Sequence, residues 1–311
     1  MRIAALFPGQ GSHAVGMGRA LHDASPAARA VLDRAEAALP GLRSIMFGGP
    51  SEELTRTAIQ QPALVAAGAA AYAAWREAGG PQPLVAAGHS LGEFTAHVAS
   101  GSLEIETAIR LVHARGRYMQ EAVAEGVGAM AAVLKLDDAV VRELCTAAGD
   151  GVEIANLNAP GQVVVSGTAE AVAAVAEAAK TRGGRAVPLK VSAPFHCRLM
   201  RPAAERLALD LERTSFSEPA FPIVRNVDAE PSSDPADAPR TLTEQVTGAV
   251  RWTEVQRVIE AIGVDRWIEF GHGKVLTNML ARTVPSADGR PVHDPASLAA
   301  ALASDDEGGS P

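Results

Sequence analysis

The sequence is poor in the residues on which several classes of protein depend. Only two of its 311 residues are cysteine, Cys145 and Cys197, so it has no disulfide framework, and no Cys/His spacing typical of a zinc site occurs. No apolar run approaches the length of a membrane span, and the start MRIAALFPGQ lacks the apolar core of a signal peptide. We therefore expect a soluble, cytoplasmic protein without a bound metal.

Positive charge is also scarce. Lys and Arg total 28 against 36 Asp and Glu, which gives a net charge of −8 and argues against nucleic acid as a general partner. An acidic protein partner would need a local basic patch on this chain. Aromatic residues make up only 4% while alanine is abundant, a composition that favours closely packed helices. The length suffices for one large domain or for a domain with an insertion.

The stretch from Pro83 to Gly101, PLVAAGHSLGEFTAHVASG, organises the rest of the chain. It begins as a buried strand, turns through G-x-S-x-G, and continues with helical spacing, which is the pattern of a nucleophile elbow. Gly88 and Gly92 fit this reading because a Cβ at either position would collide with the neighbouring strand or helix. The turn raises the hydroxyl of Ser90 above the sheet edge. We therefore predict that Ser90 is a nucleophile.

Two further patterns define the fold. Residues 2–7 predict a buried strand, followed by the tight loop PGQGS, whose backbone N–H groups can face a ligand. From Gly128 the order changes to β-α-β-β-α-β, which is the ferredoxin-like arrangement. The sequence thus predicts an α/β fold. An α/β-hydrolase-like large subdomain (1–126 and 193–311) has a parallel sheet and the nucleophile elbow, and a ferredoxin-like small subdomain (127–192) is inserted in it.

Some local expectations concern helices and the chain end. Residues 19–39 predict one continuous helix, and Gln60-Gln61-Pro62 is expected to precede a long Ala-rich helix over 63–78. The last seven residues, DDEGGSP, are typical of a disordered tail.

A serine nucleophile needs a base, and the chain has eight histidines. His89 adjoins Ser90, but neighbouring side chains at a strand end point to opposite faces. His196 lies in a Pro-containing loop at the edge between the two subdomains, where a cleft is expected, and it is the favoured base. A polar surface role is the better expectation for those in or near helices or the tail: His13, His22, His97, His113 and His293.

Ten stretches, in order and over nearly the whole chain, resemble the malonyl-CoA:acyl carrier protein transacylase family. They are FPGQGS (7–12), QPAL (61–64), GHSLGE (88–93), RGRYMQEAV (115–123), GAM (128–130), NAPGQVVVSG (158–167), PFHCRLM (194–200), NVDAEP (226–231), QVTGAVRW (245–252) and GKVL (273–276).

The resemblance implies a catalytic machinery. Ser90 would be acylated, and His196 would act as base and then as acid, oriented by the backbone carbonyl of Gln245. The backbone N–H groups of Gln10 and Leu91 would form the oxyanion hole. The substrates would be malonyl-CoA and a phosphopantetheinylated acyl carrier protein, with no cofactor, and the enzyme of fatty acid biosynthesis would be a monomer.

The resemblance also implies substrate selection. Arg115 would bind the free malonyl carboxylate through two parallel hydrogen bonds, and Gln61 would belong to the same substrate-binding set. Leu91 and Phe195 stand where related polyketide acyltransferases that use malonyl have a branched apolar residue and a Phe. We therefore expect malonyl to be preferred over methylmalonyl, by roughly 1–3 kcal/mol for one methyl group.

Two residues depart from the family pattern, since Phe94 stands where Tyr is common and His272 where Pro is usual. We expect neither to touch the chemistry. Because the family's carrier partner is acidic, we expect basic residues near the cleft to contact it, with Lys190, Arg198 and Arg201 as candidates.

Three other functions stay open at this point. A stand-alone acyltransferase could load polyketide synthase carrier domains in trans with the same chemistry. An editing hydrolase could clear stalled carriers, but it has no need for a carboxylate-binding arginine such as Arg115. A non-catalytic docking subunit would not need Ser90, His196 and Gln10 intact.

Overall fold

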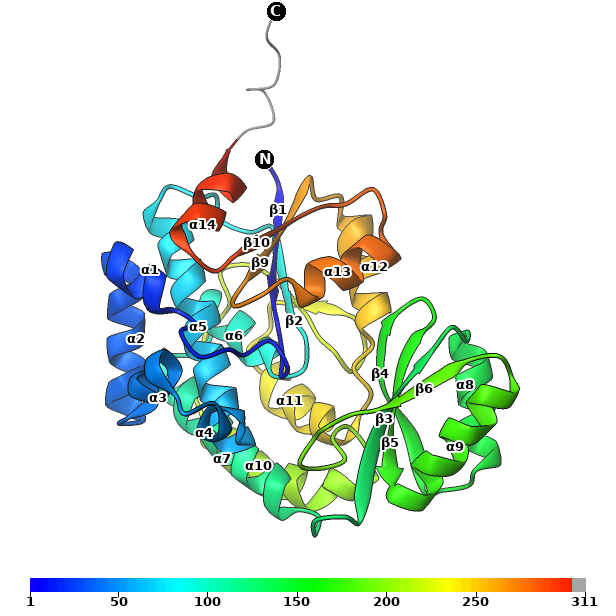
Figure 1. Cartoon of the computed structure of the whole chain (residues 1–311). Helices are drawn as coiled ribbons and strands as arrows, with labels where there is room; N and C mark the ends of the chain where they lie inside the picture. The colour runs from blue at the N-terminus through cyan, green and yellow to red at the C-terminus, as the bar shows by residue number, and fades with distance from the viewer. Residues whose placement is uncertain (304–311) are drawn as a thin grey trace, which may run out of the picture.

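Two sheets organise the molecule (Figure 1). The computed structural model describes residues 1–303, so the predicted tail lies outside the described residues. The larger sheet has the order β10-β9-β1-β2-β7-β8. Its parallel strands are β1 (Ile3–Phe7), β2 (Val85–Gly88), β7 (Ile223–Val224), β9 (Arg266–Phe270) and β10 (Asp288–Val292), and β8 (Pro231–Ser232) pairs antiparallel at the edge.

Helices cover both faces of the larger sheet. Alternate residues of β1 divide between two hydrophobic clusters: Ile3, Ala5 and Phe7 pack with α5, α6 and α7, while Ala4 and Leu6 pack with α12 and α13. Among residues 1–303, no helix is long and apolar enough to span a membrane. The helices of the large subdomain are α1 (Arg19–Ala24), α2 (Pro26–Ala38), α3 (Leu42–Gly48), α4 (Ser51–Thr55), α5 (Thr57–Glu77), α6 (Gly92–Ala99), α7 (Ile105–Glu121), α10 (Arg201–Glu212), α11 (Asp237–Thr247), α12 (Trp252–Ile262), α13 (Val275–Thr283) and α14 (Pro295–Leu302).

The smaller sheet has the order β4-β5-β3-β6 with every neighbouring pair antiparallel. Its elements follow as β3 (Gly128–Leu134), α8 (Asp138–Ala147), β4 (Val152–Ala159), β5 (Gln162–Thr168), α9 (Ala169–Thr181) and β6 (Arg185–Pro188). This is the ferredoxin-like arrangement. The helices α8 and α9 cover one face and enclose a separate core. The predicted α/β fold class, with its parallel-stranded large part and ferredoxin-like small part, is confirmed.

The two subdomains are joined by main-chain hydrogen bonds at one edge of the small sheet. Leu157 on β4 donates its N–H to the carbonyl of Val250 at 2.9 Å, and the N–H of Val250 donates to the carbonyl of Ala155 at 2.9 Å. The opposite edge strand, β6, continues through residues 189–195 back to the large subdomain. A site between the subdomains is therefore bounded on one side by β4, which is held by backbone hydrogen bonds. On the other side it is bounded by the connecting residues 189–195.

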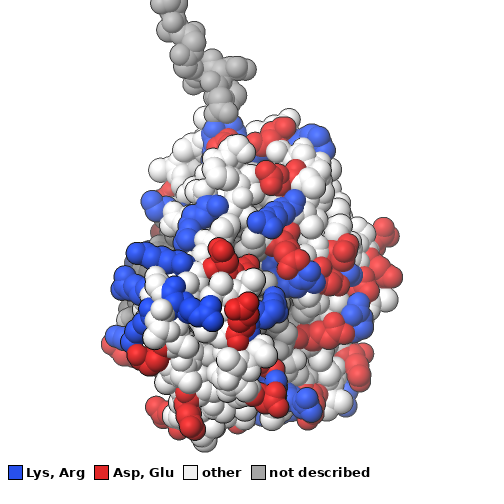
Figure 2. All heavy atoms as spheres, turned by 90° about the vertical axis from the view of Figure 1, so that its right-hand side faces the viewer, with Lys and Arg blue, Asp and Glu red and all other residues white. Residues whose placement is uncertain are grey.

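Charge is unevenly distributed over the surface. On the face seen from the side of the small subdomain, Lys and Arg side chains gather mainly on the left and Asp and Glu side chains mainly on the right (Figure 2). A chain with a net charge of −8 thus still presents a basic area.

The predicted continuous helix over 19–39 is wrong, because the chain breaks between α1 and α2. Ser25 adopts an extended conformation, and its Oγ accepts a hydrogen bond from the N–H of Ala28 at 3.0 Å. Pro26 follows at the first helical position, where a missing N–H costs nothing. A Ser-Pro pair inside an apolar periodic stretch is therefore a start signal for a second helix.

The helix expected to begin after Pro62 instead begins at Thr57, so the proline lies within α5. A proline inside a helix leaves the carbonyl four residues earlier without its N–H donor. Here that carbonyl belongs to Ala58, and it accepts a hydrogen bond from Nδ1 of His113 on α7 at 2.8 Å. A tertiary contact thus replaces the bond that the proline removes.

Candidate active site

Ser90 lies on a tight turn between β2 and α6, with a left-handed φ of 50°. The glycines around it are required by space, as the sequence predicted. A Cβ on Gly88 would lie 1.9 Å from the carbonyl carbon of Gly92, and a Cβ on Gly92 would lie 2.0 Å from the carbonyl oxygen of Phe7. The turn therefore closes only with glycine at both positions, and it holds Ser90 in a backbone conformation that other residues rarely adopt.

Ser90 and His196 form a hydrogen-bonded pair, with 2.7 Å between Oγ and Nε2. The other ring nitrogen, Nδ1, donates to the backbone carbonyl of Gln245 at 2.8 Å. A carbonyl can only accept, so Nδ1 carries the proton and Nε2 is left to accept one from Ser90. Burial, together with the positive charge of Arg115, lowers the pKa of His196 to about 3. The imidazole is therefore neutral and able to act as a base at neutral pH.

The side chain of Asn226, at the end of β7, holds the turn in place. Its Oδ1 accepts the backbone N–H of Ser90 at 2.6 Å, and its Nδ2 donates to the carbonyl of Gly88 at 2.8 Å. The N–H of Ser90 is thus already engaged and is not a donor for an oxyanion. Sequence reasoning assigned Asn226 no role, because only the fold brings it to a residue 136 positions away.

Two other backbone N–H groups, those of Gln10 and Leu91, are unengaged. Within residues 1–303, neither donates a hydrogen bond to the protein. Gln10 lies in the loop after β1, and Leu91 caps the N-terminus of α6, where the first N–H groups have no helical partner. Free N–H groups beside a nucleophile are what an oxyanion hole needs.

Arg115, on α7, is buried beside the pair, with an exposed fraction of 1%. Its Nη1 donates to Oε1 of Gln61 at 2.8 Å, and its Nη2 donates to Oε1 of Gln245 at 3.1 Å and to Oγ of Ser90 at 3.3 Å. Its Nε is buried yet has no hydrogen-bond partner. Nε and Nη2 share one edge of the guanidinium, so an incomplete donor pair lies next to the serine hydroxyl.

Phe94, which was expected not to touch the chemistry, packs against Arg115. Its ring centroid is 5.8 Å from Cζ of Arg115, within the range of a cation–π contact. Phe94 stands one helical turn after Ser90 on α6, so its side chain lies on the same side of the helix as the elbow.

Burial lowers the pKa of Arg115 to about 10, which still leaves the guanidinium charged at neutral pH.

A buried carboxyl group, Glu93, lies behind the arginine. Its Oε2 accepts hydrogen bonds from Nε2 of Gln245 at 2.8 Å and from the N–H of Asn226 at 3.1 Å. Burial raises its pKa to about 7. Sequence reasoning included Glu93 in the GHSLGE stretch without giving it a function.

Ser90 and His196 open into a hollow of about 390 Å³ between the subdomains. Met130 and Asn156 line it from the small subdomain, and Phe195 lines it next to the histidine. Phe195 is thus placed where it can limit the size of a bound group, as expected. Lys190 is the one Lys or Arg in the lining of this hollow.

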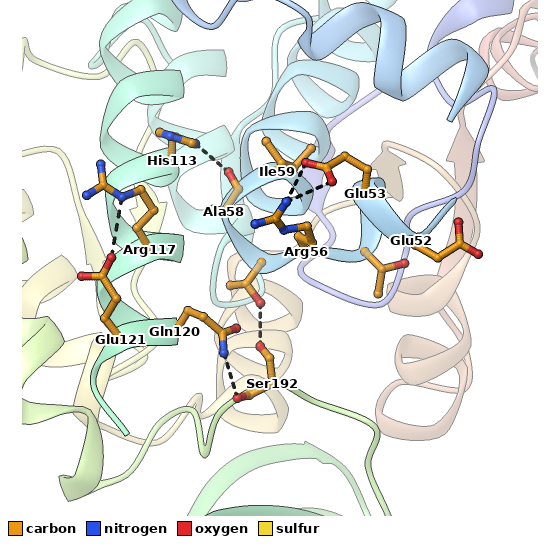
Figure 3. Close-up of a pocket in the computed structure, with 12 residues that line it drawn as sticks. Glu52, Glu53, Arg56, Ala58, Ile59, His113, Arg117, Gln120, Glu121 and Ser192 are labelled. Carbon is orange, nitrogen blue, oxygen red and sulfur yellow. Dashed lines mark hydrogen bonds and ion pairs between the residues drawn. The ribbon is translucent and has the colours of Figure 1, made fainter. Parts of the chain in front are cut away.

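A second hollow of about 680 Å³ adjoins the first at α4, α5 and α7 (Figure 3). Oγ1 of Thr57 and Oγ of Ser192 lie 2.9 Å apart and line both hollows. Gln120 supports this contact by donating from Nε2 to the carbonyl of Ser192 at 3.3 Å. On the walls, Arg56 pairs with Glu53. The contact between Thr57 and Ser192 thus lies where the active-site hollow meets the larger one.

Three other histidines lie close to the site or in the core. His89 points away from Ser90, as expected, and its Nε2 lies 2.8 Å from Oδ1 of Asn158. The expected surface role of His97 is wrong: it is buried, Nδ1 lies 3.2 Å from Oγ of Ser102, and burial lowers its pKa to about 4. The surface expectation is also wrong for His13, which lines the active-site hollow and bonds Gln60 at 2.8 Å.

His272 does not line the hollow. Burial, and then the proximity of the His272 ring, lower the pKa of His13. The ring of His272 also contacts that of His293, with 5.8 Å between centroids. These three residues follow the carboxyl ends of the neighbouring strands β1, β9 and β10.

In the described part of the chain, the cysteines and the acidic residues form no metal site. Across residues 1–303, no group of three or more His, Cys, Asp or Glu side chains is arranged to hold a metal ion. Cys145 and Cys197 are free and buried. Burial raises the pKa of the Cys145 thiol to about 11 and also raises that of Cys197, so both thiols stay protonated and pack as small buried residues.

Comparison with known proteins gives consistent results. Residues 5–305 match the family model of the acyl transferase domain. The chain is 43% identical over 305 residues to the malonyl CoA-acyl carrier protein transacylase of Salmonella typhimurium, covering 97% of this chain and 99% of that protein. The crystal structure of an acyl carrier protein S-malonyltransferase from Vibrio cholerae superposes with a TM-score of 0.94 at 42% identity, over 96% of this chain and 99% of that one.

A further solved structure contains a partner. It is a malonyl-transacylase in complex with a type II PKS acyl-carrier protein, and it superposes with a TM-score of 0.94 at 42% identity, covering 97% of this chain and 99% of that one.

Proposed function

The chain belongs to the acyl transferase family, with the malonyl-CoA:acyl carrier protein transacylases, and we propose that it serves fatty acid synthesis and that its residues divide the reaction as follows. Ser90 is the acylated nucleophile and His196 the proton shuttle. Gln245 orients the histidine through its backbone carbonyl. The N–H groups of Gln10 and Leu91 stabilise the oxyanion.

The transfer takes two balanced half-reactions. Oγ of Ser90 attacks the thioester carbon of malonyl-CoA while its proton passes to Nε2 of His196. The tetrahedral oxyanion collapses, the C–S bond breaks, and the leaving CoA sulfur takes the proton from His196. In the second half, the phosphopantetheine thiol of the carrier gives its proton to His196 and its sulfur attacks the malonyl ester. Ser90 leaves with that proton, and the free enzyme is restored.

The observation that carries this proposal is the buried, unpartnered Nε of Arg115 beside Ser90. A buried donor without an acceptor costs about 1–3 kcal/mol, and a carboxylate that spans Nε and Nη2 would remove this cost. Malonyl carries such a carboxylate two bonds from its thioester carbon, and acetyl does not. Gln61 keeps the guanidinium in place through Nη1 and leaves the other edge for the substrate.

The test is intact mass after brief exposure to malonyl-CoA, methylmalonyl-CoA or acetyl-CoA. Wild type should gain a malonyl group on Ser90 that persists without carrier and transfers when carrier is added. Methylmalonyl and acetyl should label more slowly, methylmalonyl because Phe195 and Leu91 limit the space. Arg115→Ala should lose the preference for malonyl over acetyl, and Ser90→Ala should remain unlabelled. Equal labelling by acetyl, or an adduct that hydrolyses within the mixing time, would favour an editing hydrolase.

We propose further that the enzyme acts as a cytoplasmic monomer without a cofactor. The chemistry above uses only side-chain and backbone groups of this chain. A second pathway is supported by one observation, the similarity to a malonyl-transacylase solved with a type II PKS carrier. Loading purified fatty-acid and polyketide carriers in parallel would discriminate between the two pathways.

The carrier is proposed to dock over the mouth of the hollow. Lys190 lines the mouth, and Arg201, at the start of α10, is exposed. Arg198 is less available, since its Nε donates to Oε1 of Glu153 at 2.8 Å. Exposed positive charge on these residues would favour contact with an acidic partner.

A further inference from the structure

Arg115 carries a buried positive charge that no carboxylate contacts directly. Its hydrogen-bond acceptors are the side-chain carbonyls of Gln61 and Gln245 and the hydroxyl of Ser90, all neutral. A buried cation is stable only with an opposite charge within reach. The electrostatic partner that acts on Arg115 is Glu93.

One amide group joins the two charges. Oε1 of Gln245 accepts from Nη2 of Arg115 at 3.1 Å, and Nε2 of the same amide donates to Oε2 of Glu93 at 2.8 Å. The N–H of Asn226 also donates to Oε2, so both bonds fall on one oxygen of the carboxylate. In the described part of the chain, Oε1 of Glu93 accepts no hydrogen bond.

We propose, on the basis of the proposed function, that Glu93 is the counter-ion of Arg115 in the free enzyme and that the malonyl carboxylate replaces it. Glu93 then takes up one proton from solvent as the malonyl group binds.

The charge balance of the site leads to this exchange. With Arg115 positive, Glu93 negative and His196 neutral, the free site has no net charge. An incoming malonyl carboxylate would leave one uncompensated negative charge in a buried space, which is strongly unfavourable. Protonation of Glu93 restores neutrality. The proton would go to Oε1, so both hydrogen bonds to Oε2 remain.

The proton is readily available, because burial raises the pKa of Glu93 to about 7 in the free enzyme. A second carboxylate nearby raises it further. The exchange therefore takes place near neutral pH.

The other groups around Glu93 do not change this balance. Arg225 and Asp228, beyond β7, act on it, but Arg225 is already paired with Asp228 at 2.8 Å and with Asp237. The strands β1 and β2, which pack against α6, contain no titratable side chain, and neither does the stretch 63–71 of α5. Arg225 is thus balanced by its own carboxylates, whereas Arg115 has Glu93 as the carboxylate that acts on it and is linked to it through the amide of Gln245.

Proton uptake is measurable directly. Binding of malonyl-CoA and of acetyl-CoA to Ser90→Ala would be followed by calorimetry at pH 7.5 in two buffers of different ionisation enthalpy. Acetyl-CoA is the matched ligand because it has the same CoA portion and lacks the carboxylate. We expect malonyl-CoA to take up more protons than acetyl-CoA, by an amount that approaches one per site above pH 8.

Affinity should follow the same linkage. The ratio of malonyl to acetyl affinity should fall above pH 7 by up to about tenfold per pH unit. Adding Glu93→Gln to the Ser90→Ala parent should abolish the excess proton uptake. The ratio of malonyl to acetyl affinity should then be independent of pH and equal to the value that the parent shows near pH 6. Glu205→Gln, an exposed change on α10, should behave as the parent does.

Three outcomes would overturn the proposal: equal proton uptake for the two ligands, excess uptake that persists in Glu93→Gln, or a pH-independent ratio in the parent. The comparison of the two ligands in the parent needs no change at position 93, so poor folding of Glu93→Gln would not prevent the test. Failure of the proposed function looks different, because malonyl-CoA would then bind no better than acetyl-CoA even at pH 6.

Discussion

Asn226 accepts the backbone N–H of Ser90 at 2.6 Å, so the nucleophile's own main chain is fixed by a residue from the next strand of the sheet. The same amide donates to the carbonyl of Gly88. Both sides of a strained turn are thus held by one side chain.

Asn226→Ala should therefore impair both stability and catalysis. It leaves two buried backbone groups unpaired, at a cost of about 1–3 kcal/mol of unfolding free energy. It also frees the turn, so the rate of acylation should fall while KM for malonyl-CoA changes little. Urea unfolding and single-turnover acylation measure the two effects, with Asn278→Ala, an exposed change on α13, as control. A variant that loses stability but acylates at the wild-type rate would show that Asn226 is only structural.

The pH dependence of activity should show that the positive charge of Arg115 lowers the pKa of His196. His196 works as a base only when neutral, and burial together with Arg115 lowers its pKa to about 3. Activity with acetyl-CoA should therefore persist well below pH 6 in wild type. Arg115→Met removes a nearby positive charge, so the pKa of His196 should rise and the acid limb of kcat/KM should move to higher pH. An acid limb at the same pH in both proteins would contradict this coupling.

Glu93 and the buried histidines should make the free energy of unfolding change with pH in opposite directions. Its pKa rises from 4.5 to about 7 on folding, so the folded protein holds the proton more tightly. This stabilisation is fully present below pH 4.5 and is lost as pH rises through 7, an amount of about 3 kcal/mol. His196 and His97, with lowered pKa values, lose stability as pH falls below 6.5. The difference in unfolding free energy between wild type and Glu93→Gln should therefore decline from pH 4 to pH 8. A constant difference would contradict the raised pKa.

Pro62 and His113 should be energetically coupled through the carbonyl of Ala58. His113→Ala leaves that carbonyl without a donor and should cost about 1 kcal/mol. Pro62→Ala restores an N–H at the helical position that can bond it. The double variant should therefore lose less stability than the sum of the single changes, and thermal or urea unfolding of the cycle measures the difference. Strict additivity would indicate that the His113 contact contributes nothing.

Carrier docking should depend on the exposed basic residues Lys190 and Arg201. Lys190→Glu and Arg201→Glu should raise KM for the carrier several-fold, more at low salt than at high salt, because like charges then oppose each other. Arg213→Glu, exposed at the end of α10, is the matched control. An unchanged KM for the carrier in both variants would place the docking surface elsewhere.

What the sequence could predict was mostly local or carried by the family resemblance. Ser90 follows from a short strand-turn-helix pattern, because space alone requires Gly88 and Gly92. The residues could favour His196 without excluding other histidines, and Arg115 read by itself would be a solvated helix arginine. Their roles came from the resemblance, and the structure places both within hydrogen-bond distance of Ser90 Oγ.

The parts that sequence reasoning missed depend on contacts between distant segments. Glu93, Gln245 and Asn226 meet across more than 130 positions, so no local period or spacing indicates their network. Pro62 lies inside a helix because His113 from α7 satisfies the freed carbonyl. In these cases tertiary contacts outweigh local preference, as is expected where packing decides the structure.

The small subdomain is attached differently at its two edges, and this should guide how the family's substrate range evolves. At β4 the attachment is made of backbone hydrogen bonds to Val250, whose side chain is buried in the hydrophobic core. At the other edge, Thr55, Thr57 and Ser192 lie between the active-site hollow and the larger one, and the side chains of Thr57 and Ser192 are in contact there. Heritable change in the size of accepted acyl groups should therefore accumulate at Thr57 and Ser192, while Val250 is constrained by packing in the core.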